Sequence, residues 1–216
     1  MEVYQKGELW ETKGDELTFS HTRVILKCGD EFFYALTNLP FMSSIDVSQL
    51  NPIPIPIDHI QPFYSAELTR APTPLPDNTF VKVPSLLDSG PHVEHPPSSL
   101  VLAEVRICET LKQYPHSNIA EYIGCVTQLN RITGLCFTRY EKTLADRFSC
   151  PHDLVEPEIA LAIRRGIEHL HRLGITHNDI NPYNIMFKSD GTPVIIDFDS
   201  CAHVGEKLVK GGGWED

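Results

Sequence analysis

A polar stretch near the C-terminal end constrains the fold of this sequence more than any other feature. It reads His177-Asn178-Asp179-Ile180-Asn181-Pro182-Tyr183-Asn184, and a strand, a turn and a second strand separate it from Asp197-Phe198-Asp199. The pattern delivers two carboxylates and an amide oxygen from a loop and an adjacent strand end, and such hard oxygen ligands suit Mg²⁺. One carboxylate is left to orient an attacking hydroxyl. These residues therefore predict a phosphoryl-transfer site.

The net negative charge of the sequence disfavours some classes of binding partner. The 216-residue chain carries 18 Lys and Arg against 29 Asp and Glu, a formal net charge of −11, which repels phosphate backbones and anionic lipids. We therefore expect neither nucleic acid nor a membrane as a partner. No apolar run approaches the ~20 residues that span a bilayer, and the segment Met1 to Lys6 lacks the basic start and apolar core of a signal peptide. We expect a soluble protein of the cytoplasm or nucleus.

The first third of the sequence predicts a β-rich extension. In residues 1–50, apolar runs such as Val24–Leu26 and Phe32–Leu36 flank a Gly-Asp turn, a pattern typical of a small antiparallel sheet. Prolines recur between Asn51 and Pro76 and remove backbone donors. This connector should therefore be extended and contain neither a central strand nor a helix. We expect residues 1–76 to form an N-terminal extension with a Pro-rich connector.

Strand and helix signals alternate over the rest of the chain. Helices are indicated by apolar residues that recur every three or four positions, and strands by short apolar runs between turn residues. The predicted elements are a strand at Thr79–Val83, a helix that Ser98 or Ser99 caps and Pro115 stops, strands at Ile119–Val126 and Ile132–Tyr140, a helix from Glu156-Pro157 to Gly174, and strands at Ile185–Phe187 and Val194–Ile196. The last two strands form the hairpin that follows the polar stretch.

The order of these motifs resembles that of the protein-kinase-like fold. That family shares the pattern His-x-Asp-x-x-x-x-Asn, a hairpin, and then Asp-Phe-x, which here extends from His177 to Asp199. Three segments, Ile132–Phe137, His177–Pro182 and Asp197–Ser200, are similar to a fungal group of protein-kinase-domain proteins. The resemblance covers roughly residues 70 to 216.

The resemblance implies an α+β, bilobal fold. Residues 77–140 would form a small, β-rich N-lobe, and residues 141–216 an incomplete, mainly α-helical C-lobe that contains the catalytic loop. The sequence given ends at Asp216, before the Ala-Pro-Glu segment and the helices that usually follow it. We therefore expect a C-lobe that is truncated after the Asp-Phe-Asp segment.

The resemblance also assigns roles to individual residues. Asp179 would orient the acceptor hydroxyl, and Asn184 and Asp197 would hold Mg²⁺. Lys82 would contact the phosphates of ATP, and Glu104, 22 residues later, would hold Lys82 in place. By residue type alone, a strand lysine is usually a solvated edge residue and a helix glutamate usually lies on the surface. These two roles therefore depend on the resemblance.

Tyr140 and Glu141 are expected to form the hinge between the lobes, where backbone groups would receive adenine. The hydrophobic pattern alone indicates only that a strand ends at these two residues, and a strand end is compatible with a hinge. The cofactors that the resemblance implies are ATP and Mg²⁺. The implied partner is a protein substrate that offers a Ser or Thr hydroxyl.

Several departures from the kinase pattern bear on activity. No Gly-x-Gly-x-x-Gly precedes Lys82 to cover the phosphates. Asn178 stands where many kinases have an arginine that clamps a phosphorylated activation loop. Asn181 replaces a lysine that neutralises the transferred phosphate, and Asp199 replaces a glycine.

Three functions fit these residues. The first is an ATP- and Mg²⁺-dependent phosphotransferase of the Ser/Thr protein kinase type, favoured because the five polar positions of the kinase pattern are retained. The second is a small-molecule kinase similar to aminoglycoside or choline phosphotransferases, whose catalytic loops also lack the lysine. The third is a pseudokinase, a nucleotide-binding or non-catalytic interaction module.

Overall fold

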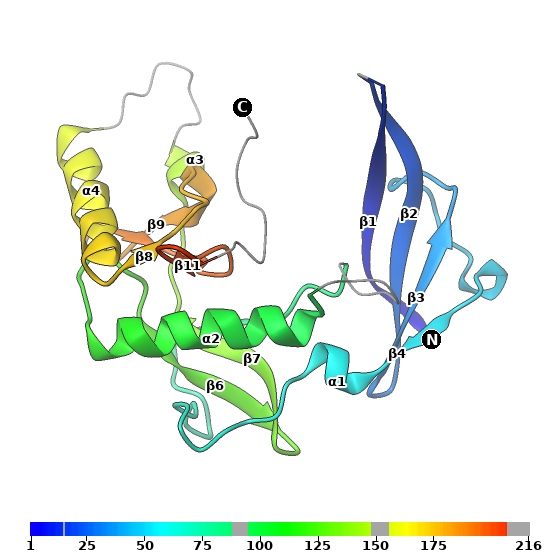
Figure 1. The fold of residues 1–216 in the computed structure, drawn as a ribbon, viewed down its shortest axis with the longest axis horizontal. Coiled ribbons are helices and arrows are strands. Elements are labelled where there is room, and N and C mark those ends of the chain that lie inside the picture. The colour runs from blue at the N-terminus through cyan, green and yellow to red at the C-terminus, as the bar shows by residue number, and fades with distance from the viewer. Residues whose placement is uncertain (15, 88–94, 148–155, 207–216) are drawn as a thin grey trace. The chain divides into compact units, whose positions relative to one another are not determined.

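The computed structural model describes residues 1–14, 16–87, 95–147 and 156–206, whose helices and strands are drawn in Figure 1. The chain divides into two compact units. Unit 1 consists of Met1–Pro62 and Pro84–Ser99, and unit 2 of Phe63–Val83 and Leu100–Asp216. Unit 2 includes residues of both predicted lobes, so the boundaries expected at residues 76 and 140 stay predictions. The C-terminal end, where we expect truncation, lies outside the described residues.

Unit 1 is built on an antiparallel sheet in which the strands follow one another in chain order. They are β1 (Glu2–Lys13), β2 (Glu16–Cys28), β3 (Glu31–Thr37) and β4 (Ile53–Ile55). The first three agree with the antiparallel sheet predicted for residues 1–50, and a 3₁₀ turn, Val47–Gln49, follows them. The core of the unit consists of Ile25, Tyr34, Ile55, Ile60 and Leu86. Because Leu86 belongs to the second segment, the chain leaves this unit and returns to it.

The prediction that the Pro-rich connector contains no helix is wrong. Residues Ile57–Ile60 form one helical turn, α1, directly after Pro56. The turn itself contains no proline, so the backbone N–H of Gln61 can donate to the carbonyl of Ile57 at 2.8 Å. Strand β4 lies in the same connector and contains Pro54, and it occupies an edge of the sheet. An edge is the position at which a strand tolerates proline.

Unit 2 begins with a second antiparallel sheet in the order β5-β7-β6. Its strands are β5 (Thr79–Lys82), β6 (Tyr122–Gln128) and β7 (Arg131–Thr138). Gly134 of β7 allows β5 to come close, because a Cβ at this position would lie 2.8 Å from the carbonyl oxygen of Lys82. The buried face of helix α2 (Pro97–Gln113) shares one apolar core with this sheet.

Helix α2 starts earlier than predicted. Its first residue is Pro97, whereas the sequence predicts a cap at Ser98 or Ser99. Proline is favoured at the first helical position because that residue donates no intrahelical hydrogen bond. The Ser99 hydroxyl donates to the carbonyl oxygen of Pro96 at 2.8 Å instead of capping the helix. The helix ends at Gln113, before Pro115, as predicted.

The second half of unit 2 combines a long helix with short pairs of strands. Its elements are α3 (Leu144–Arg147), α4 (Pro157–Arg172), β8 (Ile175–Thr176), a 3₁₀ turn (Pro182–Asn184), β9 (Ile185–Phe187), β10 (Pro193–Ile195) and β11 (Ala202–His203). β9 pairs with β10, and β8 pairs with β11, both antiparallel. Pro157 begins α4 and Gly174, with φ of 72°, follows its end, in agreement with the sequence.

Antiparallel sheets and separate helices together make this an α+β fold, as the sequence predicts. In the described part of the chain, no helix has the length and apolar character that a membrane crossing requires. The polar residues predicted from the sequence all lie in unit 2, at the end of β5, on α2, after β7, between β8 and β9, and shortly after β10. The fold of unit 2 therefore determines the geometry of the site.

Candidate active site

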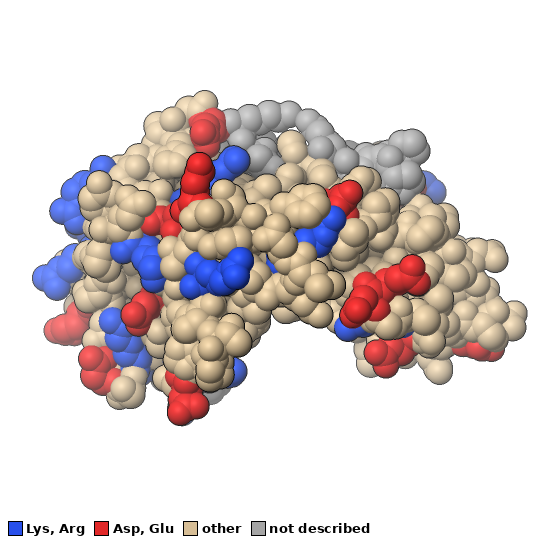
Figure 2. Space-filling view, turned by 90° about the horizontal axis from the view of Figure 1, so that it is seen from below, with Lys and Arg blue, Asp and Glu red and all other residues tan. Residues whose placement is uncertain are grey.

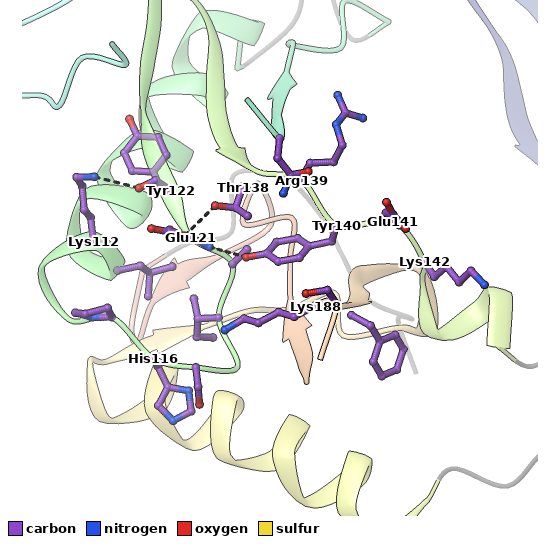
Figure 3. Close-up of a pocket in the computed structure, with 18 of the residues that line it drawn as sticks. Lys112, His116, Glu121, Tyr122, Thr138, Arg139, Tyr140, Glu141, Lys142 and Lys188 are labelled. Atoms are coloured by element: carbon purple, nitrogen blue, oxygen red, sulfur yellow. Dashed lines mark hydrogen bonds between the residues drawn. The ribbon is translucent and has the colours of Figure 1, made fainter. Parts of the chain in front are cut away.

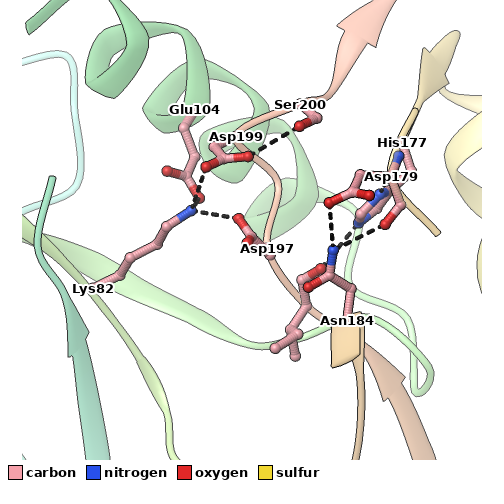
Figure 4. A network of polar contacts seen from close by, with 9 residues as sticks. Lys82, Glu104, His177, Asp179, Asn184, Asp197, Asp199 and Ser200 are labelled. Atoms are coloured by element: carbon pink, nitrogen blue, oxygen red, sulfur yellow. Dashed lines mark hydrogen bonds and ion pairs between the residues drawn. The ribbon is translucent and has the colours of Figure 1, made fainter. Parts of the chain in front are cut away.

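Lys82 lies among three carboxylates (Figure 4). It is the last residue of β5, and its ammonium is 2.7 Å from a carboxylate oxygen of Glu104 on α2. The same nitrogen lies 2.5 Å from Asp197 and 3.5 Å from Asp199, which both follow β10. The expected contact between Lys82 and Glu104 is therefore present, and Asp197 is brought to the same point.

Burial and charge act against each other in this cluster. The Glu104 side chain is 5% exposed, and burial raises the pKa of its carboxyl, an effect that the Lys82 ammonium partly offsets. Burial alone would lower the pKa of Lys82. The negative charges of Glu104, Asp197 and Asp199 outweigh burial and hold the pKa of Lys82 well above its usual range. Lys82 is therefore a permanent cation at neutral pH.

Amide groups hold both carboxylate oxygens of Asp179. The Asn184 side chain donates to one oxygen at 2.8 Å and to the Asp179 carbonyl at 2.9 Å. The Asn181 side chain donates to the other oxygen at 2.9 Å. Asn181 also accepts from the backbone N–H groups of Tyr183 and Asn184, as an N-cap does. The carboxylate is therefore fixed in orientation, while each oxygen retains a lone pair that can accept from a hydroxyl.

Hydrogen bonds join the 177–184 loop to the segment after β10. Nε2 of His177 donates to the carbonyl of Ile196 at 3.0 Å, while Nδ1 accepts from the backbone N–H of Asp179 at 3.4 Å. These partners require the tautomer with its proton on Nε2. Burial lowers the pKa of His177, although the bond to Ile196 and nearby carboxylates oppose the change. The Asn178 side chain adds a bond to the carbonyl of Ser200 at 3.0 Å.

Two residues of the site adopt a left-handed backbone conformation. φ is 62° at Asn178 and 64° at Asp197, in the region that Asn and Asp tolerate better than other residues with a Cβ. At Asp197 this conformation turns the chain sharply after β10. The turn lets the Asp197 side chain contact Lys82 while Phe198, the next residue, is fully buried in the core.

Asn184 and Asp197, the two residues expected to hold Mg²⁺, lie on adjacent segments. The backbone N–H of Ile196 donates to the carbonyl of Asn184 at 3.0 Å, so the two segments are adjacent. Asn184 uses its side-chain nitrogen to hold Asp179, which leaves its side-chain oxygen for another partner. Among the described residues, no three His, Cys, Asp or Glu side chains form a metal-binding group. The expected donors are one amide and one carboxylate, and Mg²⁺ typically takes few protein ligands. In the structure the Asp197 carboxylate contacts the Lys82 ammonium at 2.5 Å.

Tyr140 and Glu141 lie apart from this cluster. Both follow β7, and their side chains line a pocket that none of the five other predicted site residues lines (Figure 3). The Tyr140 hydroxyl oxygen accepts the backbone N–H of Glu121 at 3.2 Å, and burial raises the pKa of Tyr140. The structure does not bring these two side chains to Lys82. Their role in adenine binding through backbone groups stays a prediction.

Two contacts of the site were not predicted from the sequence. Asn181 and Asp199 were identified only as replacements for kinase residues, but Asn181 donates to Asp179 and Asp199 faces Lys82. For Asn181 a local signal exists, because Asn directly before a proline is typical of an N-cap followed by Pro at the first turn position. For Asp199 no local signal exists, because its contact depends on a residue more than a hundred positions away.

Comparison with known proteins agrees with this geometry. A family model described as "Protein kinase domain" matches residues 90–210, more than half of the chain. Similar proteins include the serine/threonine-protein kinases SMU1 of Mycosarcoma maydis (27% identical, 54% of this chain, 16% of the kinase), PSK1 of Saccharomyces cerevisiae (33%, 47% and 8%) and Tao of Drosophila melanogaster (35%, 47% and 10%). The matched region thus spans between 8% and 16% of the length of these relatives.

Proposed function

We propose that this chain, which belongs to the protein kinase domain family, is an ATP- and Mg²⁺-dependent phosphotransferase that acts on Ser or Thr hydroxyls. The observation that carries the proposal is the cluster around Lys82, in which a charged lysine is held by buried Glu104 at 2.7 Å and contacts Asp197 at 2.5 Å. The three relatives named above are all called serine/threonine-protein kinases, which supports a Ser or Thr acceptor.

Lys82 and Glu104 would position the nucleotide. The Lys82 ammonium would exchange its contacts with Asp197 and Asp199 for oxygens of the ATP phosphates. Glu104 would keep the ammonium in place during this exchange, because its own side chain is buried on α2 and cannot follow the phosphates. Holding the phosphates in one position lowers the entropic part of the barrier to transfer.

Asp179, Asn184 and Asp197 would supply the rest of the chemistry. Asn184 and Asp197 would hold Mg²⁺, which neutralises charge on the transferring phosphoryl group when bound. Asp179 would accept a hydrogen bond from the acceptor hydroxyl and take its proton as the bond from that oxygen to the γ-phosphorus forms and the bond to the β–γ bridging oxygen breaks, with ADP as the leaving group. Asn181 and Asn184 would keep the Asp179 carboxylate oriented through the two amide hydrogen bonds.

A second candidate function is a pseudokinase, and Asp199 favours it. Its carboxylate lies 3.5 Å from the Lys82 ammonium, and its negative charge opposes the approach of a triphosphate. A module with this arrangement would bind nucleotide weakly or not at all and would use its surface for partner contacts.

Titration calorimetry with ATP, with and without Mg²⁺, tests whether the site is assembled. We expect the wild-type chain to bind ATP more tightly with Mg²⁺, and Asp197→Asn to lose this dependence on the metal. Asp190→Asn is the matched control, because it removes the same charge from an exposed turn. If neither the wild-type chain nor the control binds ATP, the proposed phosphotransferase is wrong.

Turnover distinguishes the two candidate functions. Phosphate transfer to Ser- or Thr-containing peptides that disappears in Asp179→Asn supports the phosphotransferase. Binding of ATP without transfer to any peptide, and with no change in Asp179→Asn, supports the pseudokinase. A transfer activity that survives in Asp179→Asn would contradict the role given to this carboxylate.

A further inference from the structure

A second feature of unit 2 is a pocket of about 1040 Å³ that is separate from the Lys82 cluster (Figure 3). Its walls come from four parts of the unit: Asn78 before β5, the stretch from Leu111 at the end of α2 to Tyr122, the segment from Thr138 to Arg147, and the end of β9 with Lys188 and Ser189. Leu111, Ile119 and Ala120 contribute apolar surface. The volume lies slightly above the ~300–1000 Å³ that small-molecule sites occupy, so the pocket can hold a short peptide segment.

The lining of this pocket is basic, although the chain is acidic. Unit 2 holds fourteen of the eighteen Lys and Arg residues. Figure 2 shows Lys and Arg side chains interspersed with Asp and Glu on the face that it draws. Five of them line the pocket, against Glu121 and Glu141: Lys112, Arg139, Lys142, Arg147 and Lys188. His116 is a sixth basic side chain of the lining. Its pKa is lowered by burial and then by the neighbouring basic side chains His169, Arg172, Lys188 and Arg165.

Some of these groups already have partners within the pocket wall. The Lys112 ammonium donates to the carbonyls of Tyr122 and Ile123 at 3.2 and 3.1 Å. Arg139 donates to the carbonyl of Thr79 at 3.1 Å. The Glu121 carboxylate accepts from the Thr138 hydroxyl at 2.8 Å. These contacts stabilise the wall of the pocket.

Lys188 and Arg147 are the cations best placed for a ligand. Within the described residues the Lys188 ammonium has no hydrogen bond and no ion pair, and the acidic group that its charge acts on is Asp190, in the turn two residues later. Figure 3 shows its side chain extending between Tyr140 and His116. The Arg147 guanidinium lies 3.5 Å from the centre of the Phe187 ring, which orders it without neutralising it. The Tyr140 hydroxyl uses its oxygen to accept from Glu121, so its proton is available to a ligand.

We propose that this pocket binds an acidic segment of a partner protein, with the Lys188 ammonium as the principal anchor. Carboxylate or phosphate groups of the segment would contact Lys188, Arg147 and the Tyr140 hydroxyl, and an apolar side chain would cover the floor at Ile119. A short segment fits better than an extended polyanion, because the net charge of −11 would repel a nucleic acid or an anionic membrane beyond the pocket. This site does not depend on phosphoryl transfer, because it uses none of the residues around Lys82.

Fluorescence anisotropy with labelled peptides tests the proposal. The probes are hexaglutamate, a phosphoserine peptide of the same length, and hexaglutamine. We expect both anionic peptides to bind the full chain, with affinity that falls as salt rises, and hexaglutamine not to bind. Lys188→Gln should weaken binding about tenfold, and Lys188→Arg should restore it. Whichever anionic peptide binds more tightly identifies the segment as acidic or phosphorylated.

Arg106→Gln is the matched control, because Arg106 is an exposed residue of α2 that does not line the pocket. It removes the same charge and should leave the affinity unchanged. Equal losses in Lys188→Gln and Arg106→Gln would overturn the proposal, because they would indicate general attraction to the surface. Failure of both anionic peptides to bind would also overturn it. Displacement of the peptides by inorganic phosphate at a similar concentration would reassign the pocket to a small anion.

Discussion

Lys82 faces more negative charge than a single ammonium can balance. Glu104, Asp197 and Asp199 each place a carboxylate oxygen within 3.5 Å of it. Kinases have a glycine at the position of Asp199, so this third carboxylate is an addition to the expected pair. Its side chain is 21% exposed, and solvent therefore screens its charge only in part. If the proposed function is right, Asp199 would compete with the phosphates of ATP for the Lys82 ammonium.

We therefore expect Asp199→Asn to strengthen binding of ATP with Mg²⁺ by about two- to fivefold. The substitution removes one negative charge near Lys82 and keeps the size of the side chain and an oxygen that can accept from the Ser200 hydroxyl. Titration calorimetry measures the change, with Asp190→Asn in the exposed turn as the control for charge. Identical affinities of Asp199→Asn and the wild-type chain would show that Asp199 does not compete with the nucleotide.

The lowered pKa of His177 predicts how the free energy of unfolding depends on pH. Because burial lowers its pKa in the folded chain, the unfolded chain binds more protons as the pH falls below the ordinary value of about 6.5. The free energy of unfolding should therefore decrease in that range. Urea denaturation at pH 7.5 and pH 5.5 measures this decrease, which should be larger for the wild-type chain than for His177→Gln. Equal decreases would assign the pH dependence to other groups.

At the scale of elements, Gly166 determines how closely α4 approaches β10. A Cβ at this position would lie 2.9 Å from Cδ1 of Ile195 and 3.0 Å from the carbonyl oxygen of Asn118. That carbonyl already accepts from the backbone N–H of Ile195 at 2.9 Å, so it cannot move freely. The glycine is therefore a requirement of packing between a helix and a hairpin.

We expect Gly166→Ala to destabilise unit 2 by about 1–3 kcal/mol, because the overpacking outweighs the gain of up to ~1 kcal/mol in helix propensity. Denaturant unfolding followed by circular dichroism measures the effect. Glu168→Ala, an exposed substitution on the same helix, should change stability far less. A more stable Gly166→Ala chain would mean that the helix can shift away from Asn118.

Elements with local signals are the ones that the sequence predicts well. Pro157 and Gly174 mark both ends of α4, and the turn around Gly191 separates the two strands of the β9–β10 hairpin. The placement of Asp179 and Asn184 before this hairpin and of Asp197 after it was therefore predictable, because the hairpin is formed by segments that are neighbours in the sequence. The approach of Asp199 to Lys82 was not, because it depends on tertiary packing and on the left-handed backbone at Asp197.

At the scale of the whole molecule, the residues that the structure describes form two apolar cores that share no residue. One contains Ile25 and Leu86 of unit 1, and the other contains Leu170 and Phe198 of unit 2. Leu86 belongs to the first core, but it follows β5, which is part of unit 2. Unit 1 is therefore discontinuous in sequence. No periodic pattern predicts such a return, because it is determined by packing between distant segments.

Because the two cores are separate, we expect a substitution that destabilises one unit to leave the stability of the other unit unchanged. Ile25 and Leu170 are both fully buried, and truncation of such a side chain to alanine costs about 2–5 kcal/mol. We expect Ile25→Ala to lower one calorimetric unfolding transition and to leave ATP affinity unchanged, because the Lys82 cluster lies entirely in unit 2. Leu170→Ala should lower the other transition and weaken ATP binding as that core loosens. A single transition that shifts equally in both variants would mean that the two cores unfold together. Unit 1 would then stabilise the site although it contributes none of the predicted site residues.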